Sequence, residues 1–199
     1  LSSDSRGFNS SIIDALREVP RHMFLDASYE KIAYENISLP AYGGSPKPSP
    51  SDILASIDIL SPASTDVVLI AGSNAGYAAA ILSKLAAEVY LIEESPAAAA
   101  YVEIFQELGI DNITVAEQPD INSFNDIFAF DKIFIHGAVS EISENITERL
   151  SIQGNLTFVL SVSGSFQQII SLNRSLLGDR ISCGGSCYYP EIKTLQISN

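Results

Sequence analysis

DVVLIAGSNAGYAAAILSKLAAEVYLIE, residues 66–93, is the stretch of sequence that decides the fold. Its apolar ends predict two buried strands, and the glycine-containing segment between them predicts a tight turn that opens a helix. Gly72 and Gly76 remove side chains where backbone and ligand meet, while Glu93, about 20 residues further on, can accept hydrogen bonds from ribose hydroxyls. The stretch therefore predicts the opening of a nucleotide-binding βαβ unit, with a purely structural turn as the alternative.

The alternation of strands and helices continues after this unit. Apolar periodicity predicts strands at 66–71, 88–93, 112–116, 131–136 and 155–162, and helices at 76–86, 96–108 and 141–150. This order is typical of an α/β fold with a doubly wound, mostly parallel sheet of the Rossmann-like type. Two more apolar stretches, 166–172 and 180–188, follow without a long helix between them. They predict an antiparallel hairpin at one edge of the sheet.

The N-terminal part has a different composition. Residues 10–19 have helical spacing and stop at Pro20, whereas 39–52 are rich in proline, glycine and serine and predict an extended loop. Residues 52–60 return to a helical period, with Ser51 or Asp52 as the expected N-cap. We expect one domain over 1–199, with small helices and the loop in 1–60 and the Rossmann-like core in 61–199.

Composition and charge exclude several classes of protein. The 199-residue chain has 11 basic and 24 acidic residues, a formal charge of −13 that repels nucleic acids and anionic membrane surfaces. Its first residues lack the basic and apolar regions of a signal peptide, so we expect a cytoplasmic protein; Leu1 in place of methionine suggests that residues precede it. Cys183 and Cys187 are too few for a disulfide framework, and with His22 and His136 as the only histidines no metal site is expected.

In doubly wound sheets, ligands bind beyond the carboxyl ends of the strands, where the strand order reverses. The turn 72–76, Glu93, the loop 117–120 and His136 are expected there. Each has a second interpretation. Glu93 can be a solvated loop acid, Asp120 a helix N-cap and His136 a packed or capping histidine.

Three segments carry a resemblance to a known family. Arg6-Gly7-Phe8 followed by a helix ending Val19-Pro20-Arg21-His22-Met23-Phe24 resembles the N-terminal signature of protein-L-isoaspartate O-methyltransferases, an RGI segment and a helix ending VPRH.F. Ala33-Tyr34-Glu35-Asn36 through Leu39-Pro40 is similar to the family's AYED.ALP segment, and residues 130–139 resemble its FD.I.V.AA segment. The similarity covers roughly residues 6–160.

The resemblance implies a methyltransferase that uses S-adenosyl-L-methionine (SAM) and methylates the α-carboxyl of isoaspartyl residues in damaged proteins or peptides. Carried over to this sequence, Gly72, Ser73 and Gly76 lie beside the cofactor and Glu93 holds its ribose. The family's G-D-G segment, which helps to hold the adenine, aligns with 118–120. Asp120 is therefore the expected acid there, displaced by one position.

The departures from the family pattern fall in functional motifs. The glycine motif E-I-G-T-G-S-G-Y is Ile70-Ala71-Gly72-Ser73-Asn74-Ala75-Gly76-Tyr77 here, which replaces the acid and one glycine. The substrate loop T-I-S-x-P aligns with Pro46-Lys47-Pro48-Ser49-Pro50, so that Pro48 replaces the hydroxyl beside the reacting carboxyl. Lys47 and Ser49 are the expected substitutes that orient a carboxylate.

Two functions from different classes follow. An active methyltransferase is favoured by Gly72, Gly76 and Glu93, because a carboxylate is already ionised at neutral pH and its methylation needs alignment rather than a general base. A non-catalytic SAM-binding or regulatory protein is favoured by Asn74, Pro48 and Pro119. The sequence favours the enzyme and leaves its substrate open.

Overall fold

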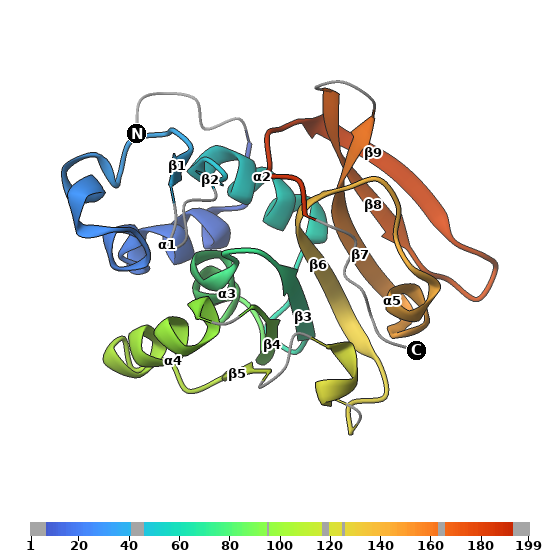
Figure 1. The fold of residues 1–199 in the computed structure, drawn as a ribbon. Helices are drawn as coiled ribbons and strands as arrows, with labels where there is room; N and C mark the ends of the chain where they lie inside the picture. The colour runs from blue at the N-terminus through green and yellow to red at the C-terminus, as the bar shows by residue number, and fades with distance from the viewer. Residues whose placement is uncertain are drawn as a thin grey trace.

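The computed structural model describes residues 7–40, 46–94, 96–116, 120–124, 126–162 and 166–192. Its centre is a seven-stranded sheet with the strand order β5-β4-β3-β6-β7-β8-β9 (Figure 1). The strands are β3 (Val67–Gly72), β4 (Glu88–Ile92), β5 (Ile113–Val115), β6 (Phe130–Val139), β7 (Leu150–Val162), β8 (Phe166–Asn173) and β9 (Arg180–Ser186). The first five are parallel, whereas β8 and β9 are antiparallel, which confirms the predicted doubly wound sheet and its antiparallel edge.

The strand order reverses next to β3. The chain passes from β3 through β4 to β5 on one side, then returns to place β6 directly against the other side of β3. Gly72, the last residue of β3, pairs in register with His136 of β6. The expected ligand position of a doubly wound sheet therefore lies at the carboxyl end of β3.

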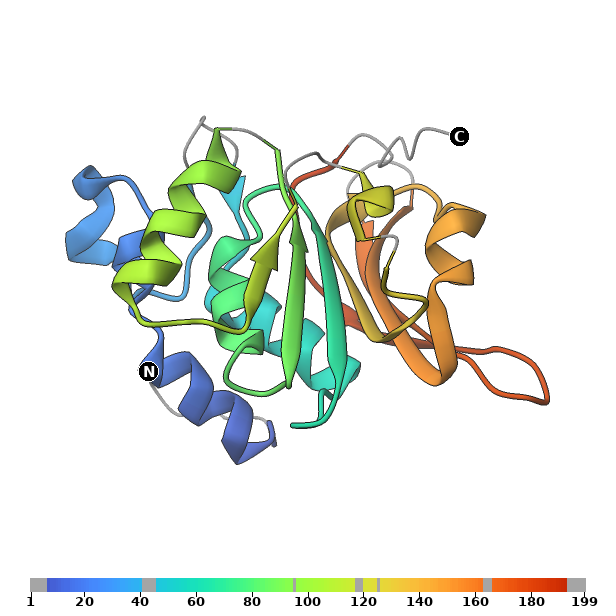
Figure 2. The same cartoon turned by 90° about the horizontal axis from the view of Figure 1, so that it is seen from below.

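Alternate residues of the strands face two separate cores. Val68 and Ile70 pack in the cluster shared with α1 (Ser10–Glu18), α2 (Pro50–Leu60), α3 (Gly76–Leu82) and α4 (Ala97–Glu107). Leu69 and Ala71 pack in the cluster on the opposite face, under η3 (Ile121–Phe124) and α5 (Glu144–Glu148). Figure 2 shows the sheet between these two layers. Because both faces are covered, the parallel strands are apolar on both sides, as their sequences predict.

The N-terminal segment packs beside α3 and α4. It contains two short 3-10 helices, η1 (Arg21–Phe24) and η2 (Ala27–Ile32), and a two-stranded antiparallel pair, β1 (Leu39–Pro40) with β2 (Pro46–Lys47). The predicted loop at 39–52 thus contains a minimal sheet. Helix α2 begins at Pro50, and its N-cap is Ser49, whose side chain accepts a hydrogen bond from the backbone of Asp52. The prediction of Ser51 or Asp52 as N-cap was wrong. Proline is favoured in the first helical position, so the helix begins at Pro50, closer to the N-terminus than predicted.

Two other helices are shorter than predicted. Helix α3 ends at Leu82 instead of residue 86, and the following turn carries the chain into β4. Helix α5 covers only Glu144–Glu148, because Leu150 already pairs with Phe130 at the start of β7. Tertiary pairing here overrides the local helical pattern.

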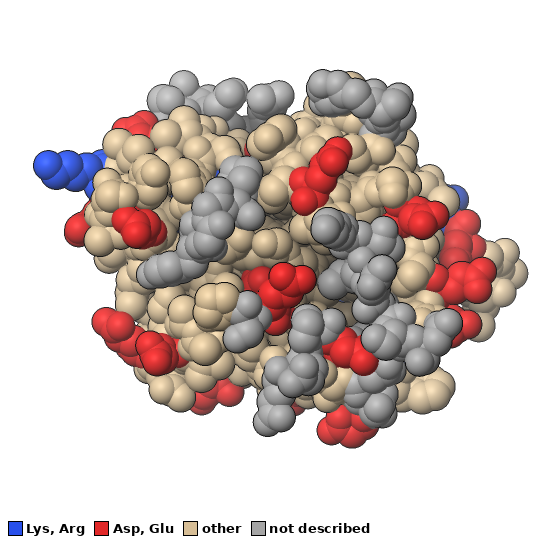
Figure 3. All heavy atoms as spheres, in the orientation of Figure 1, with Lys and Arg blue, Asp and Glu red and all other residues tan. Residues whose placement is uncertain are grey.

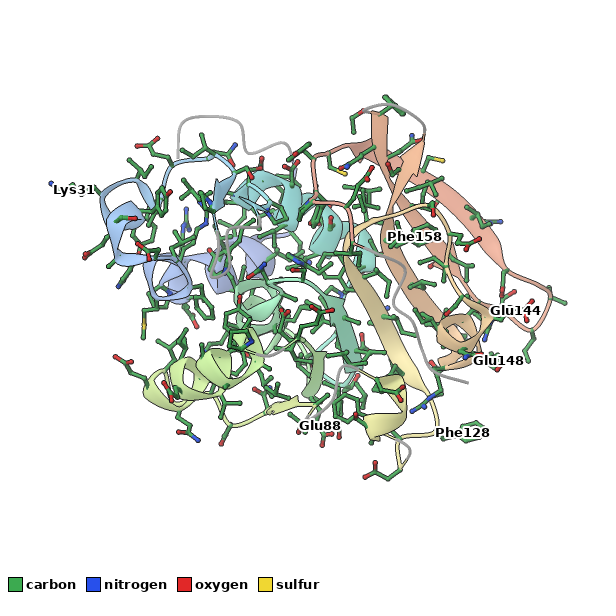
Figure 4. All side chains as sticks on the ribbon, in the orientation of Figure 1. Lys31, Glu88, Phe128, Glu144, Glu148 and Phe158 are labelled. Atoms are coloured by element: carbon green, nitrogen blue, oxygen red, sulfur yellow. The ribbon has the colours of Figure 1, made fainter. Side chains whose placement is uncertain are left out.

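The surface is acidic. Acidic side chains far outnumber basic ones on the face shown in Figure 3, in line with the formal charge of −13. Figure 4 shows Lys31 and Phe128 projecting away from the body, and Phe128 is 93% exposed. Within the described ranges, no helix has the length and apolar character needed to cross a bilayer.

Candidate active site

The glycine turn lies at the carboxyl end of β3 and has a backbone that few residues can adopt. Gly72 has a φ of 148°, and a Cβ atom there would lie 2.2 Å from the carbonyl oxygen of His136. Such an approach is far inside van der Waals contact, so only glycine fits. The backbone of β6 thus requires glycine at this position, and the predicted approach of a ligand to Gly72 stays a prediction.

Asn74 keeps the turn in shape where the family pattern has a glycine. Its φ is 58°, in the left-handed region, which asparagine enters more readily than other residues with a side chain. The side chain is buried, with its Nδ2 donating to Ser73 Oγ at 3.0 Å and its Oδ1 accepting from the Tyr101 hydroxyl at 3.4 Å. The substitution therefore preserves the backbone and adds a polar anchor. The left-handed tolerance of asparagine is the sequence signal for this role.

Gly76, the first residue of α3, is required by packing. A Cβ atom there would lie 2.5 Å from two atoms of the Tyr101 ring and 2.7 Å from a third. Tyr101 comes from α4 and is fully buried. It is a residue of the site that the sequence analysis missed, because an aromatic residue on an amphipathic helix carries no signal of its own.

Glu93 points back toward the turn. It follows β4 and is only 3% exposed, so the interpretation as a solvated loop acid was wrong. Its Oε2 accepts from the backbone N–H of Ala75 at 2.8 Å, and its Oε1 accepts from that of Glu94 at 3.1 Å. Burial raises the pKa of this carboxyl to about 7, against the opposing effect of these N–H groups and of Lys47. An ionised carboxylate has about four acceptor positions, so two bonds leave capacity for hydroxyl groups of a ligand.

Lys47, on β2, reaches the same region from the N-terminal segment. It is 3% exposed, and its Nζ donates to the carbonyl of Phe24 at 2.6 Å and to the Tyr101 hydroxyl at 3.1 Å. Its charge also lies 5.2 Å from the centre of the Tyr101 ring. Desolvation lowers the pKa of this ammonium to about 7, although Glu93 acts in the opposite direction.

Ser49, the other expected residue of the substrate loop, has its hydroxyl engaged in the helix cap. The Oγ atom donates to Asp52 Oδ2 at 2.8 Å and accepts from the backbone of Asp52 at 3.2 Å. Pro48, beside it, offers only its carbonyl, which lies 3.5 Å from a nitrogen of the Arg21 guanidinium. The loop thus has a well-defined position but presents little free hydroxyl chemistry.

Arg21 explains why the N-terminal motif needs an arginine. It is 2% exposed, and besides Pro48 it donates to the carbonyls of Ala33, Glu35 and Ile37, each at 3.0 Å. A planar guanidinium with five N–H donors can hold several carbonyls at once, which a lysine cannot. The side chain ties the loop after η2 to the candidate substrate loop.

His136 and Asp120 lie at different depths. His136 is 1% exposed, and burial lowers its pKa to about 4, so the ring is neutral and Nδ1 donates to the carbonyl of Ser73 at 3.2 Å. This agrees with a packed histidine that supports the turn.

Asp120 is half-buried, and its backbone carbonyl accepts a hydrogen bond from the backbone N–H of Ser123 in η3. Gln118 and Pro119, the rest of the expected adenine segment, lie outside the described residues.

The structure brings together most of the predicted site. Lys47, the turn and Glu93 meet near the carboxyl ends of β3 and β4, and Lys47 and Glu93 each shift the other's pKa. Asp120 follows the neighbouring β5. Ser49 is held at the start of α2 by its capping bonds. This arrangement suits a ligand whose hydroxyl groups donate hydrogen bonds to Glu93 and another part of which lies against the glycine turn.

Sequence comparisons identify similar proteins. The family described as protein-L-isoaspartate(D-aspartate) O-methyltransferase (PCMT) matches residues 4–182. A protein-L-isoaspartate O-methyltransferase of Roseiflexus castenholzii is 34% identical over 160 residues, which are 80% of this chain and 72% of the relative. Another from Methanoregula boonei is 33% identical over 165 residues, 82% of this chain and 75% of the relative.

Solved structures have the same fold. A protein-L-isoaspartate O-methyltransferase superposes with a TM-score of 0.82 at 21% identity, covering 95% of this chain; the chain spans 63% of that protein's length. A second structure, described as a PCMT from Plasmodium falciparum in complex with S-adenosyl-L-homocysteine, has a TM-score of 0.74 at 15% identity, with 97% of this chain and 92% of that chain covered. At these identities the structural likeness establishes the fold.

Proposed function

The chain belongs to the protein-L-isoaspartate O-methyltransferase family, and on that premise we propose that it transfers a methyl group from SAM to the α-carboxyl of isoaspartyl residues in proteins or peptides. The observation that carries the proposal is the glycine turn, which keeps its left-handed backbone at Asn74 and its contact with the Glu93 carboxylate. These two features support the proposal, although the sequence of the turn departs from the family motif. We propose the cytoplasm as its location, supported by the unpaired thiols of Cys183 and Cys187.

We assign the cofactor to the turn and the two acids. We place Gly72, Ser73 and Gly76 beside it, because this turn lies at the carboxyl end of β3, where doubly wound sheets bind their ligands. Glu93 accepts the ribose hydroxyls with the oxygen lone pairs that Ala75 and Glu94 leave free. Asp120, the acid of the expected adenine segment 118–120, follows the neighbouring strand β5, and we propose that it helps to hold the adenine.

The reaction requires alignment more than acid–base chemistry. SAM supplies an electrophilic methyl group on a positively charged sulfur, and a substrate carboxylate is ionised at neutral pH, so no side chain has to remove a proton. The protein holds the two partners in line and excludes water, a contribution that in well-oriented reactions is worth about 7–11 kcal/mol. The substrate loop predicts Lys47 and Ser49 for the substrate side, and we propose that Ser49 lies there.

A second function is supported by the substrate loop. Pro48 has no hydroxyl, and the hydroxyl of Ser49 already caps α2 through Asp52. This favours a protein that binds SAM without methylating isoaspartate at an appreciable rate. It shares the cofactor site with the enzyme and differs only in the transfer step.

One pair of measurements separates the two functions. Transfer of a labelled methyl group from SAM to an isoaspartyl peptide, with the matching aspartyl peptide as control, tests catalysis. Calorimetric titration with S-adenosylhomocysteine tests the cofactor site. Binding with isoaspartyl-specific transfer supports the enzyme, binding without transfer supports the non-catalytic protein, and absence of binding at millimolar ligand refutes both.

A further inference from the structure

Lys47 is a buried basic residue whose hydrogen-bond partners among the described residues are neutral. Its two hydrogen-bond acceptors, the Phe24 carbonyl and the Tyr101 hydroxyl, are neutral. Within the part of the chain that the structure describes, no carboxylate lies within ion-pair distance of its ammonium. An ammonium has three N–H donors, so these two acceptors leave one N–H over, and neither acceptor carries a charge that balances the ammonium. Buried charges are normally paired.

The charged groups of the described residues around Lys47 do not supply that partner. Glu93 raises the pKa of Lys47 from a distance, but its oxygens are directed at the backbone of Ala75 and Glu94. Arg21 adds a second buried cation and opposes protonation of Lys47. On the β6 side His136 is neutral, so it contributes no negative charge. No described residue thus supplies a negative charge in contact with Lys47, and an anion that arrives with a ligand would supply it.

The position of Lys47 indicates which ligand. Its bond to the Tyr101 hydroxyl continues to Asn74 Oδ1, inside the turn that faces the cofactor in the proposed function. Lysine carries its charge on a flexible four-carbon stem, so the ammonium can turn toward a ligand at the turn while the stem stays packed. The acidic surface in Figure 3 repels anions, so a carboxylate bound here needs a specific buried cation.

We propose that Lys47 is a carboxylate-binding residue, and that the carboxylate is the one at the amino-acid end of the cofactor. The proposal rests on the proposed function, because it uses the same cofactor turn. It gives Lys47 a role in cofactor binding instead of the contact with the substrate carboxyl that its place in the substrate loop predicts.

The test compares S-adenosylhomocysteine with two analogues, its decarboxylated form and 5′-methylthioadenosine, which lacks the whole amino-acid end. Wild-type protein is expected to bind S-adenosylhomocysteine on the order of 10- to 100-fold more tightly than the decarboxylated form, as one charged hydrogen bond requires. Lys47→Met removes the charge and keeps the chain length. It is expected to abolish this preference and to leave the affinity for 5′-methylthioadenosine unchanged.

The control is Lys132→Met. Lys132 lies in β6, and its ammonium is 3.8 Å from a carboxylate oxygen of Asp66, the residue just before β3. This pair lies at the start of β3, whereas the glycine turn lies at its end. This variant is expected to keep the full carboxylate preference. If Lys47→Met is insoluble, the test uses the wild-type protein at about pH 8. The proton uptake that accompanies ligand binding is then measured by calorimetry in buffers of different ionisation enthalpy. Uptake is expected with S-adenosylhomocysteine and not with the decarboxylated form, since a bound carboxylate holds the proton on Lys47.

The outcomes are distinguishable. Equal weakening of all three ligands by Lys47→Met, or no carboxylate preference in the wild type, overturns the inference and leaves the proposed function intact. Unchanged cofactor binding with a raised KM for the isoaspartyl peptide also overturns it, because the carboxylate is then the substrate's. Failure of the wild type to bind any of the three ligands overturns the cofactor site itself.

Discussion

Gly76→Ala is the smallest change that tests whether the glycine turn and its packing form one unit. The new methyl group would lie 2.5–2.7 Å from three atoms of the Tyr101 ring. Ordinary contacts between carbon atoms lie near 3.5–4.0 Å, so the ring has to retreat by about 1 Å. Tyr101 is fully buried and stacked near Phe105, with 6.3 Å between ring centres, which leaves it little room to move.

The cost follows from that geometry. An added methyl group in a well-packed core typically costs about 1–3 kcal/mol. For a chain of this size, each kcal/mol lowers Tm by about 2–4 °C, so a decrease of about 2–12 °C is expected. Displacement of Tyr101 also pulls its hydroxyl from Lys47 and Asn74, now at 3.1 Å and 3.4 Å. Loss of one such positioned contact predicts about tenfold weaker cofactor binding.

The assay combines thermal unfolding with calorimetric titration of S-adenosylhomocysteine. Gly185→Ala is the control, because a Cβ atom at this residue of β9 would meet nothing within 4 Å; it is expected to change neither quantity. In a Tyr101→Leu background, which removes the ring, Gly76→Ala should cost at least about 1 kcal/mol less than in the wild type. A Gly76→Ala protein with unchanged Tm and unchanged affinity refutes the reasoning.

Glu93→Ala is expected to weaken SAM binding by about 10- to 100-fold in a titration, the value of one or two charged hydrogen bonds, and an unchanged affinity assigns the ribose to another group. Cofactor affinity is expected to be highest near pH 7. Below this pH, protonation of Glu93, whose pKa is about 7, removes a carboxylate acceptor, and above it deprotonation of Lys47, whose pKa is also about 7, removes a cation. A cofactor affinity that does not change with pH contradicts this. Asn74→Ala is expected to be about 1 kcal/mol less stable to denaturant than Asn74→Gly. Both variants lack the amide, but only alanine is strained at a φ of 58°. Equal stabilities of the two variants would exclude backbone strain. Methylation of an isoaspartyl peptide is expected to be about 10²- to 10³-fold slower than by a relative with the T-I-S-x-P loop, with partial recovery in Pro48→Ser; a wild-type rate within about threefold of that relative would show that Pro48 is harmless.

The sheet and the turn could be predicted because their signals are local. Residues 66–93 contain both strands, the turn and the acid of one βαβ unit, and the continuous apolar run of β3 is visible in the sequence. The boundaries that failed depend on partners far away in sequence. Leu150 belongs to a strand because it pairs with Phe130, and no property of residues 141–150 reveals that pairing. Local periodicity therefore predicts which elements exist better than where they end.

The hydrogen bonds of the candidate site also could not be predicted from local sequence. Asn74 and Lys47 stand where the family pattern has a glycine and an isoleucine, and in the sequence they are two unrelated departures. In the structure they are the two ends of one hydrogen-bonded chain through Tyr101, which accepts from Lys47 and donates to Asn74. Each polar side chain is buried, and without the Tyr101 hydroxyl each would keep only one hydrogen-bond partner, Phe24 or Ser73. A buried polar atom left unsatisfied in this way destabilises the protein. Together they satisfy each other through a tyrosine on a third element. What the sequence presents as loss of a binding motif is therefore a coupled change that keeps the turn intact and brings a positive charge to it, which is why the charge of Lys47 is the property of this site most in need of measurement.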